Sequence, residues 1–526
     1  MPDREGRRAR TVRSAASIAA ILAAFLLVRL PLLTREGVIR GWNSDSAIFG
    51  LMAKKIHDGT GFDVFFWGQN HLGPLTSILA AAIRKAFLDP AGVGPEGGAL
   101  ALRLASMIEI AFAIGVSFLA LQRLFGYAIA LVAGLWLAAG PSFLVRVSAV
   151  PMGPEMSLAL GSVLLLLAAH AITNAPGGPD RPVRQFSFGL VAGLGWWMNQ
   201  TVVFVIAPAA LVLALRSTAR GTGLGRIARL AAPLAAGFVL GHAPVWLGRL
   251  LGWYEPTYTF RVPLLPQPGV VSRAARFVTT DFWRLVGLDG RGCPPGLWLA
   301  GLALAALLLL VERKRFFSPV TPAPPTITGV ELAGAIVGTG AYVFVLTERT
   351  PGQLRYLAPA LPAALGLLGA AVAEGGRWAR RRLPRAVVSP SLGLLAVLAL
   401  ILVWTDTRRT INTILREPDP RPLLQTIEAG GYTVCHADYW TAYKLQFLSD
   451  ERVRFVPFHS FDRNREESAR LRRTAGPQCL VTPDGAVRPW GPEDAADEGG
   501  PARRRAEAAT PSKPASPDRG PSSLSP

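Results

Sequence analysis

Long apolar blocks separated by short polar segments run through most of this 526-residue chain. Each block spans about 17–22 residues, the length needed to cross a hydrocarbon core of about 30 Å. The blocks are rich in Leu, Ala and Gly, whereas buried β-strands are shorter and richer in Val and Ile. The pattern predicts an all-α polytopic membrane protein with about 11 transmembrane helices. The expected spans are 14–33, 101–122, 127–147, 153–172, 187–200, 201–215, 229–248, 296–311, 329–347, 355–373 and 387–406.

One further apolar block, residues 72–88, leaves two threadings open. If the amides of Asn199 and Gln200 break the chain into two short spans, block 72–88 lies on or dips into the outer leaflet. If 187–215 is one long span, block 72–88 crosses the membrane and Glu155 moves to the cytoplasmic side. The distribution of Arg residues favours the first threading.

The formal net charge of +20 is concentrated between the apolar blocks. Arg residues cluster at 4–13, 216–229, 312–315 and 377–385, as the positive-inside rule expects of cytoplasmic segments. The basic N-terminus, residues 1–13, is therefore expected in the cytoplasm and the C-terminus outside. This explanation of the charge leaves no reason to expect nucleic acid as a partner.

The first apolar stretch resembles a signal peptide in its basic start and apolar centre. It has no convincing small-residue cleavage site, and Arg29 and Pro31 interrupt its end. We expect an uncleaved first span, with Arg29 extending toward the outer interface.

The first outer loop, residues 35–99, is long and polar, which in a membrane protein indicates a functional segment. Residues 45–57 predict an amphipathic helix that lies along the membrane surface and ends at Gly59–Gly61. An aromatic run typical of the membrane interface follows, and then the segment 68–74. The helix places Ile48, Leu51, Met52 and Ile56 on one face and Lys54, Lys55, His57 and Asp58 on the other.

After a transmembrane domain of residues 14–406, with a second long outer loop at 249–295, the composition becomes that of a soluble domain. Residues 407–484 predict a small extracytoplasmic α/β domain, with helices at 423–429 and 438–448 and strands at 432–436, 453–458 and 478–481. Residues 485–526 are rich in Pro, Ala, Ser, Gly and charge, and we expect them to be disordered. Cys435 and Cys479 are either a disulfide pair or two buried thiols, and no metal-binding spacing is present.

Several short motifs in this order resemble the bacterial branch of the GT-C membrane glycosyltransferases, which includes aminoarabinose–lipid A transferases and protein O-mannosyltransferase-like enzymes of glycosyltransferase family 39. The resemblance covers roughly residues 14–375, and it also favours the first threading. The segment 437–443 is similar to one found in a subset of such bacterial proteins. The motifs are Asn43–Ala47, Gly68–Pro74, Arg103–Ser106, Arg123–Gly126, Pro141, Glu155, Gly193–Trp197 and Arg355–Pro359.

The resemblance implies transfer of a sugar from a polyprenyl-phosphate donor to an extracytoplasmic acceptor, by an enzyme of the bacterial plasma membrane. An acceptor hydroxyl is a poor nucleophile near neutral pH, so a carboxylate beside it is needed to take its proton. Asp45 is the candidate general base. Its alternative role is that of an N-cap or first-turn acid of the helix 45–57.

Five further residues are candidates for the site, and a sixth, Glu109, is a polar residue within a span. Glu155 is either a second carboxylate or a first-turn helix acid. Arg355, and less strongly Lys54, are candidate contacts of the donor phosphate, although interfacial Arg is common as an anchor. His71 and Gln69 are expected to contact the donor or the acceptor, or to be ordinary polar contacts of the interface. Glu109 is intramembrane and is expected to pair with another span.

The chain departs from the family pattern in having a single acid in the first loop, where many relatives have paired Asp and Glu. No second outer-loop acid with a metal-binding partner stands out, so the sequence identifies no metal site. The resemblance alone leaves a divalent metal open as a cofactor. A transporter or flippase of a lipid-linked glycan is the alternative function, but such proteins place polar residues at mid-membrane and often contain inverted repeats. A third reading is an inactive scaffold that anchors the C-terminal domain.

Overall fold

The computed structural model describes residues 2–94, 96–173, 181–218, 224–253, 269–287, 325–347, 351–382, 385–458, 462–474 and 476–494. The chain divides into two compact units, Met1–Pro420 and Arg421–Pro526. The expected span 296–311, the parts 254–268 and 288–295 of the loop 249–295, and residues 495–526 of the expected tail 485–526 lie outside the described residues.

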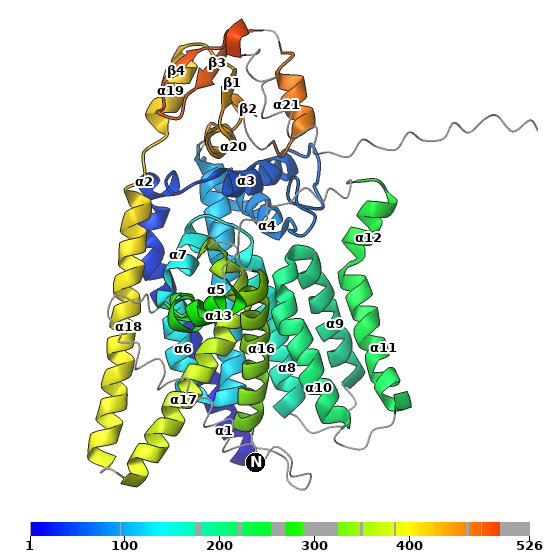
Figure 1. The fold of residues 1–526 in the computed structure, drawn as a ribbon, viewed down its shortest axis with the longest axis vertical. Helices are drawn as coiled ribbons and strands as arrows, with labels where there is room; N and C mark the ends of the chain where they lie inside the picture. Colours follow the sequence, from blue (N-terminus) through cyan, green and yellow to red (C-terminus); the bar gives the residue numbers. More distant parts are fainter. Residues whose placement is uncertain are drawn as a thin grey trace, which may run out of the picture. The chain divides into compact units, whose positions relative to one another are not determined.

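The first unit is a bundle of helices around one apolar core (Figure 1). The helices α3 and α4 lie at the end of this bundle opposite the N-terminus. The described α-helices are α1 (Pro2–Arg29), α2 (Arg35–Val38), α3 (Ser44–His57), α4 (Leu75–Ile83), α5 (Gly97–Phe125), α6 (Tyr127–Ala139), α7 (Ser142–Ala149), α8 (Pro154–Thr173), α9 (Arg181–Met198), α10 (Val203–Thr218), α11 (Leu224–Gly241), α12 (Ala243–Leu250), α13 (Val270–Arg276), α14 (Phe282–Leu285), α16 (Pro325–Thr347), α17 (Leu361–Arg382) and α18 (Arg385–Leu415). The shorter 3₁₀ or π turns are η1 (Leu30–Leu33), η2 (Arg84–Leu88), η3 (Gln200–Val202), η4 (Phe277–Asp281) and η5 (Pro351–Ala360).

Within the described residues, four helical segments are long and apolar enough to cross a membrane, or six if two bent pairs each count as one span. The mostly helical, apolar architecture is therefore confirmed, whereas the expected number of about 11 spans is not. The four segments are Arg8–Leu33, Gly97–Phe125, Pro154–Thr173 and Leu354–Arg381. Block 72–88 is not among them, because α4 covers only Leu75–Ile83 before a π turn.

The expected span 127–147 consists of the two helices α6 and α7, bent by 57°. Gly140 has a φ of +85°, and Pro141 has no amide hydrogen, so the helix cannot continue there. The last carbonyls of α6, which have no partner within the helix, accept hydrogen bonds from side chains of α1 and α18. Arg29 donates to the Ala138 carbonyl at 2.7 Å, and Thr407 donates to the carbonyls of Ala139 and Gly140 at 2.8 Å.

These contacts correct the expectation for Arg29. Its side chain does not extend to an interface but is completely buried, where it also donates to the Ser148 hydroxyl at 2.9 Å. A cation at this depth is tolerated when it is hydrogen-bonded to carbonyls that would otherwise be unsatisfied.

The expected break near Asn199 is confirmed, since α9 ends at Met198 and α10 begins at Val203 after the turn η3. On its other side, α9 packs backbone to backbone against α11. A Cβ on Gly189 would lie 2.0 Å from the Leu234 carbonyl oxygen, and one on Gly237 would lie 2.1 Å from that of Phe186. Close helix packing through small residues is common in membrane proteins.

The predicted juxtamembrane helix is present as α3, but most of it is buried instead of lying on a surface with one polar face. It packs against α4 and α5, and Ser77 of α4 donates to the Phe49 carbonyl at 2.8 Å. Phe65 and Phe66 of the following aromatic run are buried as well, so this segment is part of the core and not only an interfacial belt.

The second unit contains a four-stranded sheet in the order β2-β1-β3-β4, in which β1 pairs in parallel with β2 and β3, and β4 is antiparallel to β3. The five expected α/β elements are thus present, shifted by a residue or two, whereas α21 was not expected and β4 lies in the tail that was expected to be disordered. The expected boundary at residue 406 was wrong, because α18 continues to Leu415 and the second unit begins at Arg421. Its elements are α19 (Arg421–Ala429), β1 (Val434–Ala437), α20 (Tyr439–Leu448), β2 (Arg454–Pro457), α21 (Arg465–Leu471), β3 (Gln478–Val481) and β4 (Val487–Pro489). Cys435 and Cys479 are paired directly across β1 and β3 and form a disulfide, which decides between the two expectations for these cysteines.

The segment 437–443 is accounted for largely by local structure. Asp438 caps α20 by accepting from the Trp440 amide at 2.8 Å. The buried Tyr443 hydroxyl donates to Asp462 at 3.0 Å and accepts from two backbone amides of the segment after β2. Burial, with the nearby Asp462 charge, raises the pKa of the Tyr443 phenol. This motif therefore starts α20, which connects β1 to β2, and anchors the segment after β2 to this helix.

Candidate functional site

Arg103, on α5, positions the start of the first outer loop. Its buried guanidinium donates to the carbonyls of Leu32 at 2.6 Å, Gly37 at 2.7 Å and Arg40 at 2.7 Å. It also donates to the Ala149 carbonyl, at the end of α7, at 2.8 Å. One planar guanidinium with five N–H groups thus joins the stretch 32–40 to the end of α7. The ammonium group of a lysine could not donate to all four carbonyls.

The backbone fixed in this way leads directly into the Asp45 motif. Asn43 is the N-cap of α3, because its side-chain oxygen accepts from the Ser46 amide at 2.8 Å. Asp45 is half-buried in the first turn. The N-cap reading of Asp45 is therefore wrong, whereas the reading as a first-turn acid, favourable at the positive end of the helix dipole, holds.

The segment that precedes α4 is held between two distant parts of the chain. Leu72 forms a β-bridge with Asn199, and the Gly73 amide donates to the Met198 carbonyl at 2.8 Å. The Asn199 side chain also donates to the Gly153 carbonyl at 3.1 Å. The break between α9 and α10 therefore supplies the free backbone groups that join the segment 68–74 to the turn before α8.

Two buried carboxylates lie at this junction. Glu109 of α5 accepts from the Thr76 hydroxyl, whose oxygen lies 2.9 and 3.1 Å from its two carboxylate oxygens. Glu155, completely buried in the first turn of α8, accepts from the amides of Gly153 at 2.9 Å and Met152 at 3.2 Å. The two carboxyl groups are close enough to interact electrostatically.

Arg355 lies in the turn η5, which packs against α8. Its Nη1 is 3.7 Å from the Met152 sulfur, its guanidinium lies over the Tyr356 ring at 5.3 Å, and its charge acts on Glu155. Its Nε is buried, and no hydrogen-bond partner for it is found among the described residues. An arginine with an unused donor beside carboxylates is suited to binding an anionic oxygen.

The structure thus brings Glu155 and Arg355 together and adds Glu109, Thr76 and Asn199 to them. Asp45 and Lys54 lie on the neighbouring helix α3, where Lys54 forms an ion pair with Asp58 at 3.0 Å. His71 is exposed and Gln69 is half-buried, both in the segment joined to Asn199. The sequence signal for Glu109 and Asn199 was their polar character within apolar blocks, but their partners are far away in the sequence.

Across the described residues, no three His, Cys, Asp or Glu side chains gather in a way that would hold a metal ion. Glu109 and Glu155 form a pair, and backbone amides and a hydroxyl already occupy part of their oxygens. Hard divalent cations take six or more oxygen ligands, several of them often water. These residues do not by themselves make a metal site.

No protein-family model matches the chain, and no curated protein matches it in sequence. Its fold is similar to that of solved GT-C glycosyltransferases, which confirms the resemblance found in the sequence. The aminoarabinose transferase ArnT from Cupriavidus metallidurans, solved in the apo state, matches with a TM-score of 0.56 and 16% identity over 90% of this chain and 94% of that one. The same protein bound to undecaprenyl phosphate matches with the same values.

An archaeal oligosaccharyltransferase from Archaeoglobus fulgidus, tethered to an acceptor peptide, matches with a TM-score of 0.52 and 13% identity. That match covers 84% of this chain and 63% of the archaeal one. At these identities the likeness establishes a GT-C-like fold, and function has to be argued from the site.

Proposed function

We propose that this protein is a membrane glycosyltransferase that moves a sugar from a polyprenyl-phosphate donor to an acceptor outside the cytoplasm. The observation that supports it most is the fold match, which covers 90% of this chain and 94% of a transferase also solved with undecaprenyl phosphate. The buried Glu155 and Glu109, with the half-buried Arg355, add a polar centre, which Thr76 of α4 and Asn199 connect to the segment 68–74.

In this proposal Asp45 takes the proton of the acceptor hydroxyl as that oxygen bonds to the anomeric carbon of the sugar. The bond between the anomeric carbon and the phosphate oxygen breaks, and polyprenyl phosphate leaves with the bonding electrons. Arg355 stabilises the charge that grows on this phosphate. Glu155 orients the acceptor or Arg355, and Gln69, His71 and Lys54 contact the substrates.

We further propose a multi-pass protein of the bacterial plasma membrane, with the N-terminus inside and the second unit outside. The disulfide between Cys435 and Cys479 supports this orientation, because disulfides persist in oxidising compartments. An archaeal relative by fold was crystallised with zinc and sulfate, at a TM-score of 0.50. The transfer assay is therefore run with and without a metal chelator, and the proposed mechanism itself uses no metal ion.

The test is transfer by the purified full-length chain in proteoliposomes, given polyprenyl-phosphate sugars and a bacterial envelope acceptor extract, with and without a metal chelator. Asp45→Asn is expected to lower the transfer rate by about 10²–10⁴-fold. The matched control is Asp450→Asn, at a turn residue with a φ of 52° that Asn readily adopts. Full activity of Asp45→Asn contradicts its role as base, and glycan movement across the vesicle without transfer contradicts the enzyme proposal in favour of a flippase.

A further inference from the structure

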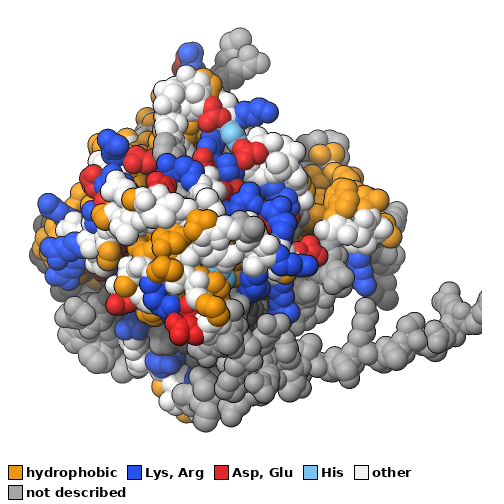
Figure 2. All heavy atoms as spheres, turned by 90° about the horizontal axis from the view of Figure 1, so that it is seen from above, with side chains coloured by type: hydrophobic (Ala, Val, Ile, Leu, Met, Phe, Trp, Pro, Cys, Tyr) orange, Lys and Arg blue, Asp and Glu red, His pale blue; other side chains and the backbone are white. Residues whose placement is uncertain are grey.

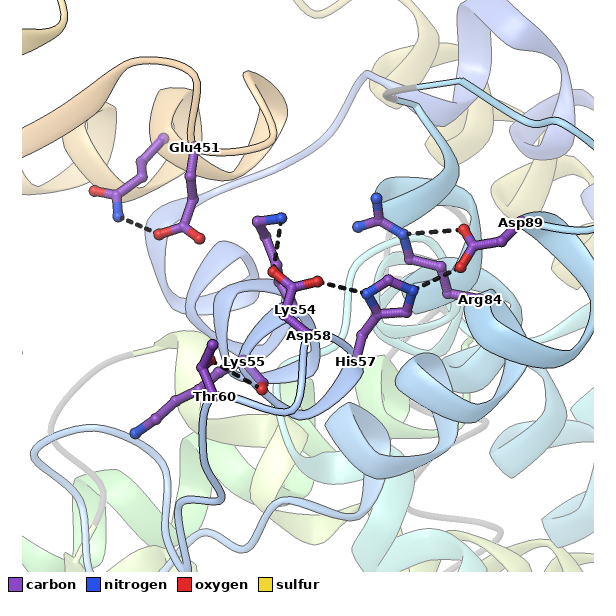
Figure 3. Close-up of polar contacts among 9 residues, drawn as sticks. Lys54, Lys55, His57, Asp58, Thr60, Arg84, Asp89 and Glu451 are labelled. Carbon is purple, nitrogen blue, oxygen red and sulfur yellow. Dashed lines mark hydrogen bonds and ion pairs between the residues drawn. The ribbon is translucent and has the colours of Figure 1, made fainter.

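A row of five side chains with alternating charge lies at the end of α3 (Figure 3). The contacts run from Lys54 to Asp58 at 3.0 Å, from Asp58 to His57 at 2.6 Å and from His57 to Asp89 at 2.6 Å. Arg84 completes the row at 3.6 Å from Asp89. Lys54, His57 and Asp58 lie at the C-terminal end of α3, whereas Arg84 and Asp89 belong to the π turn after α4 and its cap.

The geometry at His57 requires a particular protonation state. Nδ1 faces an oxygen of Asp58 and Nε2 faces an oxygen of Asp89, both at 2.6 Å. A neutral imidazole has one N–H, so its other nitrogen would direct a lone pair at a carboxylate oxygen. Only the imidazolium donates to both carboxylates at once.

Both carboxylates are in the form that this arrangement needs. Partial burial acts against the charge of Asp58, but the hydrogen bond from His57 and the contacts with Lys54 together hold the pKa of its carboxyl below the ordinary value. The hydrogen bond from His57 likewise holds the pKa of Asp89 below its ordinary value. The cations Lys54 and Arg84 flank the row at its two ends, so each carboxylate lies between two basic side chains.

The contact between His57 and Asp89 joins residues that are 32 positions apart. The chain between them contains Gln69, His71 and the whole of α4 with Thr76, which donates to Glu109. Closing such a segment removes much of its conformational freedom, and an exposed ion-pair contact can open again without unfolding the core.

Figure 2 shows Lys and Arg side chains interspersed with Asp and Glu side chains over the face of the molecule seen from above.

We propose that His57 is a positioning residue, an imidazolium clamp that holds the loop 58–71, before the anchored Leu72 and Gly73, in place and releases it when the imidazole loses its proton. A neutral imidazole donates to only one of the two carboxylates, so loss of the proton breaks one of the two contacts. The loop that is expected to contact substrate is thereby ordered while His57 is protonated and loosened when it is not. The clamp follows from the geometry alone, and only its effect on transfer rests on the proposed function.

The test is hydrogen–deuterium exchange of the full-length protein in nanodiscs, read on peptides from 58–74 and corrected for the chemical exchange rate. In the wild type, exchange is expected to become at least about fivefold faster as the pH rises through the value at which the ¹⁵N chemical shifts of the His57 ring report loss of its proton. His57→Gln and Asp89→Asn are expected to exchange quickly on both sides of that value. His170→Gln, which removes an imidazole elsewhere in the first unit, is expected to keep the wild-type pH dependence.

Two results overturn the proposal. One is wild-type exchange that does not change with pH beyond the chemical rate, and the other is a His57→Gln protein with the same pH dependence as the wild type. If His57→Gln does not fold, Asp89→Asn and the ¹⁵N chemical shifts of the His57 ring, which distinguish imidazole from imidazolium, decide the same question. The pH profile of sugar transfer is a separate readout, so failure of the enzyme proposal leaves the exchange result valid.

Discussion

The hydroxyl oxygen of Thr76 lies 2.9 and 3.1 Å from the two carboxylate oxygens of Glu109, and both side chains are buried. This contact joins α4, which follows the segment 68–74, to the centre of α5. Arg103 and Glu109 are six positions apart on α5, about 9 Å along its axis. One helix therefore positions both the start of the Asp45 loop and one member of the buried acid pair.

Thr76→Val is expected to destabilise the protein by about 1–3 kcal/mol, because it leaves the buried Glu109 carboxylate without this donor. Thr76→Ser keeps the hydroxyl and serves as the control. Denaturant unfolding in detergent measures the difference. Equal stability of the two variants would show that the Thr76–Glu109 contact contributes little.

Arg103→Leu is expected to cost at least about 3 kcal/mol, since four buried carbonyls lose a charged donor. Arg103→Lys should recover little of this loss, because an ammonium cannot reproduce the planar fork of donors. Thermal unfolding of both variants tests the claim. A lysine variant as stable as the wild type would contradict the role given to the fork.

Gly153→Ala is expected to disturb the acid pair without changing any charge. Gly153 has a φ of +98°, and a Cβ there would lie 2.5 Å from a methyl carbon of Leu72. We expect a loss of about 1–3 kcal/mol and reduced transfer activity. Gly334→Ala is the matched control, because a Cβ at Gly334, within α16, meets nothing within 4 Å.

The charge row around His57 also predicts behaviour in acid. The pKa values of Asp58 and Asp89 are lowered in the folded protein. Their stabilising contribution is therefore present above the ordinary Asp value of about 4 and is lost as the pH falls through the lower folded values. Replacing both by Asn should flatten the stability profile below about pH 4, which unfolding curves at several pH values would measure.

Loss of the disulfide is expected to weaken the second unit selectively. Cys435 and Cys479 are 44 residues apart, and closing a loop of that length corresponds to about 4 kcal/mol in the chain-entropy model. Cys435→Ser with Cys479→Ser should make the chain after residue 420 sensitive to protease while the helical unit stays intact. In cells, both cysteines of the wild type should resist alkylation until a reductant is added, and ready alkylation would contradict the extracytoplasmic placement.

The predictions from sequence were best where a local rule decides the outcome. The extent of α3, the break at Asn199 and the three parallel strands of the second unit follow from periodicity, turn residues and the cost of amides in an apolar block. The bend within the expected span 127–147 was not predicted, because the donors that satisfy its carbonyls, Arg29 and Thr407, are far away in the sequence.

By itself, the sequence determined that the protein is a polytopic helical bundle with a small α/β unit, and that polar residues of the first loop were worth testing. Hydrophobic length and residue periodicity are local properties, and they are enough for that conclusion. Only the tertiary structure decided that Glu109 meets Thr76, that Asn199 joins Leu72 to Gly153, and that His57 lies between Asp58 and Asp89. These pairings join elements far apart in the sequence, and they are set by which buried polar groups must satisfy one another once the helices pack.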